Sequence, residues 1–190
     1  MDAHRDNDSV AREIRCFELA RRLIFHEVRT QTISKLTGLS RDRLTTLRHR
    51  LKVSDDARHR GPPPRSLDVL LRTARGRTEG AAVAALLLLF TRPTSSKLRS
   101  SLDDGEQACD IYDAYLAYYP KSNVRFEELM LLKRSLAEGG LLELGLCSEC
   151  KGLIMNNRCD RPRHICSHCD HLGEPERGSL IHSERANGLS

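Results

Sequence analysis

The chain has 190 residues, of which 39% are hydrophobic and 30% are charged, and its formal net charge is +5. This composition is typical of a folded protein and excludes an extensively disordered one. The length allows one domain of moderate size with a small appendage. Aromatic residues make up only 4% and Trp is absent. We therefore expect a core of aliphatic side chains, which favours helices over a β-sandwich.

Neither a secretory signal nor a membrane span is expected. Residues 1–9 are polar, contain three Asp, and lack the apolar stretch of a signal peptide. The longest apolar run, residues 81–90, is about half the roughly 20 residues that a transmembrane helix needs. We expect a soluble, cytoplasmic protein with no membrane partner, in which residues 81–90 form a helix that is buried on every side.

The N-terminal region, residues 1–60, is predicted to begin with an amphipathic helix over about residues 9–28, with Ser9 as its N-cap. Its apolar face is marked by residues that recur at spacings of three, four and seven, as one face of a helix requires. These residues are Val10, Ile14, Phe17, Ile24 and Val28.

Residues 30–51 have the pattern of a helix-turn-helix. Gly38 stands where the sharp turn needs a positive φ, and Ser40 is placed to cap the second helix. The side chains that we expect to be buried in the motif are Ile33, Leu36, Thr37, Leu39, Leu44, Leu47 and Leu51. An ordinary pair of antiparallel helices joined by a glycine turn would have the same pattern.

A basic segment overlaps this motif. Residues 41–77 contain 11 Lys and Arg against 4 Asp and Glu, whereas the rest of the chain has slightly more acids than bases. Such a concentration is expected of a surface that contacts phosphates, although a solvated arginine-rich loop would look the same. Recognition helices present exposed polar residues to the major groove. The candidate DNA contacts here are Arg41, Thr45, Thr46, Arg48, His49 and Lys52.

A proline-rich linker is predicted at residues 61–66, because three consecutive prolines cannot continue a helix. A helical core follows over residues 67–145, then a zinc-binding module over 146–172 and a flexible tail over 173–190. The predicted fold class is mainly α: a helical bundle with a helix-turn-helix-like element and a small C-terminal module with four cysteine ligands.

Two Cys-x-x-Cys pairs, separated by 15 residues, predict a metal site made of Cys147, Cys150, Cys166 and Cys169. Four thiolates suit a tetrahedral zinc ion and leave no open position, so we expect one structural Zn²⁺ per chain. Cys159, His164, His168 and His171 lie nearby, so a set of three cysteines and one histidine stays open. The basic residues between the pairs are further candidate DNA contacts: Arg158, Arg161 and Arg163.

Four segments of the chain resemble the C subunit of the bacterial flagellar master regulator, the FlhC family. They are LTGLSRDRLTTL (36–47), GPPP (61–64), YDAYLAYYP (112–120) and EGGLLEL (138–144), which runs into the two cysteine pairs. The resemblance implies a transcriptional activator of flagellar genes with a four-cysteine zinc site. It also implies a heterohexamer with a partner subunit of the FlhD type, binding to promoter DNA, and activation of RNA polymerase.

Two other functions fit parts of the pattern. A regulator of other genes could join a helix-turn-helix to a zinc ribbon and act without a D subunit. A zinc enzyme would need an open coordination position and a nearby general base. The sequence contains no HExxH motif, glycine-rich phosphate loop or nucleophile signature, so we expect that the protein is not an enzyme.

Overall fold

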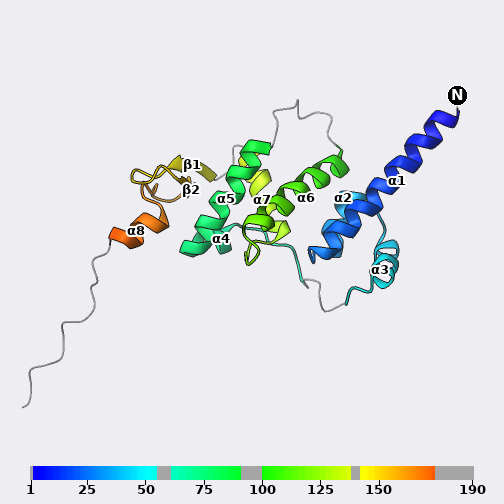
Figure 1. The fold of residues 1–190 in the computed structure, drawn as a ribbon, viewed down its shortest axis with the longest axis horizontal. Helices are drawn as coiled ribbons and strands as arrows, with labels where there is room; N and C mark the ends of the chain where they lie inside the picture. Colours follow the sequence, from blue (N-terminus) through cyan, green and yellow to red (C-terminus); the bar gives the residue numbers. More distant parts are fainter. Residues whose placement is uncertain (1, 55–60, 91–99, 138–141, 174–190) are drawn as a thin grey trace, which may run out of the picture.

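In the computed structural model, which describes residues 2–54, 61–90, 100–137 and 142–173, the chain forms helices and one small hairpin (Figure 1). The N-terminal helices are α1 (Asp2–Phe25), α2 (Thr30–Thr37) and α3 (Arg41–Arg50). The central helices are α4 (Asp68–Arg72), α5 (Ala74–Phe90), α6 (Ser101–Tyr118) and α7 (Phe126–Ala137). The C-terminal module consists of β1 (Leu142–Leu146), β2 (Leu153–Asn157) and α8 (Ser167–Gly173). The predicted fold class is confirmed.

Helix α6 is the centre of the packing. It contacts α1 and α2 on one side and α5 and α7 on the other (Figure 1). Gly105 allows the close approach to α1 and α2, because a Cβ atom there would lie 2.8 Å from Leu19 Cδ2 and 3.3 Å from Leu36 Cβ. The helix begins with a capping box in which Ser100 and Asp103 bond to each other's backbone amides. The capping box therefore fixes the start of the helix at Ser101.

Helix α1 differs from the prediction at both ends. It begins at Asp2, and the chain leaves the helix after Phe25, where Glu27 adopts a φ of 56°. The predicted apolar face is correct only for the second half. Val10 and Ile14 are 56% and 64% exposed, because the first half of α1 extends beyond the other helices (Figure 1). The residues that α1 does bury are Cys16, Leu19, Ala20, Leu23 and Ile24.

The helix-turn-helix geometry predicted for residues 30–51 is present. Gly38 has a φ of 74°, and its amide closes α2 by donating to the carbonyl of Ser34 at 2.8 Å. Leu39 is buried between the two helices, and the Ser40 hydroxyl caps α3 by accepting from the amide of Arg43 at 3.3 Å. The turn therefore has the local features that a sharp connection between two short helices needs.

Helix α5 is longer and less buried than predicted. It begins at Ala74, includes the whole run 81–90, and buries Val83, Ala84 and Leu87. The prediction that this run is buried on every side is wrong, because the last turn is exposed. Leu88, Leu89 and Phe90 are 57%, 76% and 55% exposed. An apolar sequence shows that a helix can be buried all round, but neighbouring elements decide how far along its length that happens.

Two other predicted segments, the linker and the tail, lie at the edges of the described residues. The linker is described from Gly61, where Pro63 and Pro64 are half-buried, whereas residues 55–60 before it lie outside the described residues. The flexible tail was predicted for 173–190, of which only Gly173, the end of α8, is described. No helix in the described ranges has the length and apolar character needed to cross a membrane.

Candidate metal centre and nucleic-acid interface

The first cysteine pair lies in the turn of the β1–β2 hairpin. The strands pair antiparallel, with Leu146 opposite Leu153 at the end of the ladder. Beyond that pair the Cys147 amide donates to the Gly152 carbonyl at 2.8 Å, and the Lys151 amide donates to the Cys147 carbonyl at 3.1 Å. Lys151 has a φ of 60°, which closes the turn. This tight turn brings the two sulfur atoms of the pair to the same side, as metal knuckles require.

The second pair is brought back to the hairpin by hydrogen bonds from the intervening loop. The Asn156 side chain both donates to the Arg163 carbonyl and accepts from the Arg163 amide, each at 3.1 Å. The Ser148 amide donates to the His164 carbonyl at 2.8 Å. These bonds align the chain so that Cys166 and Cys169 lie at the start of α8, opposite the turn that carries Cys147 and Cys150.

The four predicted sulfur atoms lie together, all within 4.8 Å of one another. The Sγ atoms of Cys150 and Cys166 are 3.7 Å apart. Four sulfurs at about 2.3 Å from one zinc ion are separated by about 3.8 Å, so the spacing fits a tetrahedral site. The amide of Cys166 donates to the Cys147 sulfur at 3.3 Å, and this bond would orient the sulfur toward an ion. The cluster could hold a metal ion.

The thiols of the cluster interact strongly. Backbone amides of Cys150 and Cys166 donate to Cys147 and lower its pKa to about 6. The sulfur of Cys169 lies against those of Cys166 and Cys150, and this raises the pKa of Cys169 to about 12. Cys147 therefore loses its proton easily, whereas the neighbouring sulfurs oppose ionisation of Cys169. A divalent cation among the sulfurs would offset that repulsion, which is the electrostatic condition for a four-thiolate site.

The alternative ligands that the structure describes near the cluster are not part of it. Cys159 is exposed, and neither it nor His164 nor His168 belongs to the group of donor atoms that lie together. The side chain of His171 lies outside the described part of the structure. Among the described residues the geometry therefore favours four cysteines over a set of three cysteines and one histidine.

A second group of donor atoms lies between α1 and α6, formed by His26, Cys109 and Asp113. Its groups already have partners, because the Asp113 carboxylate pairs with both Arg22 and His26, the latter at 2.6 Å. Burial raises the pKa of the Cys109 thiol to about 12, which keeps it protonated. We interpret this group as an ion-pair contact between the two helices.

The candidate DNA contacts of the helix-turn-helix are exposed with one exception. Arg41, Thr45, Thr46 and His49 are exposed on α3, and Lys52 is exposed just after it. The prediction for Arg48 is wrong. Arg48 is only 4% exposed, and its guanidinium donates to the carbonyl of Val28 at 3.0 Å, so it ties α3 to the end of the first helical segment. The helical spacing that places Arg48 on the polar side also places it one turn after Leu44, at the edge of the buried face.

The other candidate contacts, Arg158, Arg161 and Arg163, are exposed on the loop that joins the two cysteine pairs. Figure 1 shows that this loop and α3 lie near opposite ends of the molecule. The two groups of basic residues therefore cannot contact the same phosphate. If both bind DNA, they contact separate parts of it.

Arg77, which is not among the residues predicted from the sequence, joins the cysteine module to α5. Its guanidinium donates to the Ser167 hydroxyl at 3.1 Å, between the two cysteines of the second pair, and to the Leu71 carbonyl at 3.0 Å. Burial and the nearby charge of Arg163 lower the pKa of Arg77. In the sequence Arg77 is only one of many arginines in a basic segment, and no local pattern marks this role.

No protein-family model and no curated protein matches this chain.

Proposed function

We propose that this protein is a DNA-binding transcriptional activator and not an enzyme. The observation that carries the proposal is the geometry of α2 and α3. The positive φ of Gly38, the buried Leu39 and the capped start of α3 make a helix-turn-helix. The exposed face of α3 presents Arg41, Thr46 and His49 to the outside. This arrangement is the one that places a recognition helix in a major groove.

The cysteine cluster supports a structural zinc ion as the metal. Four thiolates would occupy all positions of a tetrahedral zinc, which leaves none for substrate or water and argues against zinc catalysis. The ion would hold together a module whose own buried side chains are few, chiefly Leu142, Ile154 and Met155. Through Ser167 and Arg77 it would also hold the module against α5.

The resemblance to the FlhC family supports a narrower function, in which the chain is one subunit of a hetero-oligomeric regulator. The complex would contain a partner subunit of the FlhD type, bind promoter DNA of flagellar genes, and activate RNA polymerase. An exposed apolar groove supports the proposal of a partner subunit. Val10 and Ile14, with Phe17 and Leu47, line a groove between α1 and α3, and the first two are more than half exposed. Exposed apolar surface of this kind favours association.

The DNA proposal predicts which basic residues matter. Replacing Arg41, His49 and Lys52 together with Gln should weaken binding to a flagellar promoter fragment by about tenfold or more, and should lower the salt slope by about 0.9 for each lost phosphate contact. The matched triple variant replaces Arg158, Arg161 and Arg163 with Gln. Because the two groups lie at opposite ends, their effects report separately on each end. Affinity is measured by fluorescence anisotropy at several salt concentrations.

Arg125→Gln serves as the control for general loss of positive charge, since Arg125 is exposed just before α7 and belongs to neither group. If neither triple variant changes the affinity or the salt slope while both remain folded, the DNA proposal is wrong at both ends. If only the second triple variant weakens binding, the contact lies at the cysteine module and α3 has another role.

The partner proposal predicts that the chain made alone is poorly soluble, and that co-expression with a FlhD-type subunit gives a discrete hetero-oligomer. Ile14→Glu should weaken that assembly, because it places a charge in the apolar groove, whereas Arg12→Glu on the same helix should not. Sedimentation velocity measures the assembly. A monodisperse chain that binds its promoter fully without a partner would contradict the proposal and favour a regulator that acts alone.

A further inference from the structure

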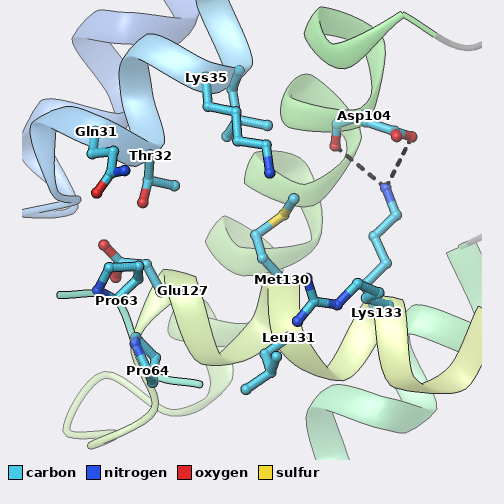
Figure 2. Close-up of a pocket in the computed structure, with 12 residues that line it drawn as sticks. Gln31, Thr32, Lys35, Pro63, Pro64, Asp104, Glu127, Met130, Leu131 and Lys133 are labelled. Atoms are coloured by element: carbon cyan, nitrogen blue, oxygen red, sulfur yellow. Dashed lines mark hydrogen bonds and ion pairs between the residues drawn. The ribbon is translucent and has the colours of Figure 1, made fainter. Parts of the chain in front are cut away.

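A cavity of about 480 Å³ lies between the helix-turn-helix and the central helices. Its walls come from α2, from Pro63 and Pro64, and from α6 and α7 (Figure 2). Helices α2 and α7 both pack against α6, and the cavity occupies the space between them. Its volume falls within the range of about 300–1,000 Å³ that is usual for small-molecule sites.

One face of α7 forms a wall of the cavity, and along the helix this face changes from acidic through apolar to basic. Glu127, Met130, Leu131 and Arg134 all line it, at positions i, i+3, i+4 and i+7 of the helix. The stripe therefore begins with a carboxylate, continues with two apolar side chains, and ends with a guanidinium. Seven residues of α-helix place its charged ends about 10 Å apart along the axis.

The carboxylate of Glu127 has an unfilled hydrogen-bonding position. The side chain is only 4% exposed, and its Oε1 atom accepts from the Arg29 amide at 2.9 Å and pairs with the Arg29 guanidinium at 3.3 Å. Its Oε2 atom is buried and has no hydrogen-bond partner among the described residues. A buried acceptor without a donor is unfavourable, so a donor from a ligand at this end of the cavity would be favoured.

The other end of the cavity is positively charged. Lys133 already pairs with Asp104 at 3.2 Å, as Figure 2 shows. Lys35 on α2 and Arg134 on α7 are exposed and have no ion pair within the described ranges, and both line the cavity. Because Asp104 is already paired with Lys133, the two further cations at this end would attract an anionic group.

From this arrangement we propose that the cavity binds a small, elongated zwitterion with an apolar middle, of the chemical class of a short apolar peptide. Its ammonium group bonds to Glu127, its apolar side chain lies on Met130 and Leu131, and its carboxylate lies between Lys35 and Arg134. Three extended residues span about 10 Å, which matches the separation of the charged ends. A free amino acid is too short to reach both.

The tripeptide Ala-Leu-Ala is the probe for this proposal, with the full-length zinc-loaded chain in the calorimeter cell. We expect saturable binding of one peptide per chain. Acetylating the peptide's amine should weaken binding about tenfold or more, because the charged donor to Glu127 is lost, and amidating its carboxylate should do the same at the other end. Free leucine should bind far more weakly. Absence of saturable binding for Ala-Leu-Ala would overturn the proposal.

Variants of the chain test the placement of the ligand. Arg134→Gln should weaken binding of Ala-Leu-Ala but leave the amidated peptide unaffected, while Arg125→Gln, just before the same helix, should change neither. Met130→Trp, which fills the middle of the cavity, should abolish binding without loss of the fold as judged by circular dichroism. If Arg134→Gln and Met130→Trp both bind the peptide as the unmodified chain does, the site lies elsewhere and the proposal is wrong.

A consequence for regulation rests on the proposed function. Gln31, Thr32 and Lys35 belong to α2, so a bound ligand bridges the first helix of the helix-turn-helix and α7. Peptide binding should therefore change promoter affinity in the unmodified chain but not in Met130→Trp. The calorimetric measurement of peptide binding needs no DNA. Peptide binding without an effect on promoter affinity would therefore contradict only this coupling. If the unmodified chain binds the peptide but does not bind promoter DNA at all, only the proposed function is contradicted.

Discussion

Replacing Cys147 or Cys166 with Ser is expected to lower bound zinc from one ion per chain to none and to unfold the C-terminal module. Both sulfurs lie in the cluster, and Cys147 is completely buried. A serine hydroxyl is a poor substitute for a thiolate, and a three-thiolate site would have to recruit water. The module would depend on the proposed ion because its hairpin has only two strands, which are marginal without further support.

Cys159→Ser is the matched control for this experiment. Cys159 lies on the same loop but is exposed and outside the cluster, so its loss should leave the zinc content unchanged. Elemental analysis measures the metal, and amide hydrogen exchange over residues 142–173 measures the order of the module. A cobalt-substituted chain should show the absorption of a tetrahedral four-sulfur site. Full zinc in Cys147→Ser together with none in Cys159→Ser would overturn the ligand assignment.

The second large effect is expected at the buried pair of Arg29 and Glu127. Glu127→Ala should lower the free energy of unfolding by about 3–5 kcal/mol, because it leaves the Arg29 guanidinium buried without its counter-charge. The Arg29 amide at the start of α2 also loses its acceptor, and one guanidinium nitrogen of Arg29 already has no hydrogen-bond partner in the described structure. The loss is a large fraction of the roughly 5–15 kcal/mol typical of a folded domain. Urea unfolding measures it.

Two further variants separate the causes. Glu127→Gln keeps an oxygen acceptor for the Arg29 amide and should lose less stability than Glu127→Ala. Arg29→Met with Glu127→Leu should recover part of the loss, since apolar residues often replace a buried ion pair without penalty. Glu106→Ala removes the partly exposed partner of Arg15 and should cost at most about 1 kcal/mol. Equal losses for Glu127→Ala and Glu106→Ala would show that burial does not control the strength of the Arg29 pair.

Local spacing in the sequence is enough to predict several features of this protein. The turn at Gly38, the cap at Ser40 and the grouping of each cysteine pair depend on residues within four positions of one another. For these features the backbone geometry of a single turn decides the structure. The main helices follow from apolar periodicity for the same reason, although the start of α6 is set by the capping box at Ser100, which lies before the apolar pattern.

Other features depend on contacts between segments that are far apart in the chain. Arg48 is buried because the carbonyl of Val28 lies beside it, and Ile14 stays 64% exposed because it lines an open groove between α1 and α3. Local periodicity does not indicate contacts between distant residues. Arg29 pairs with Glu127, 98 residues away, and Arg77 donates a hydrogen bond to Ser167, 90 residues away. Periodicity describes which side of an element can be buried. Only the packing of the elements determines which charged groups are enclosed with it and which apolar groups stay outside, because burial depends on neighbours in space.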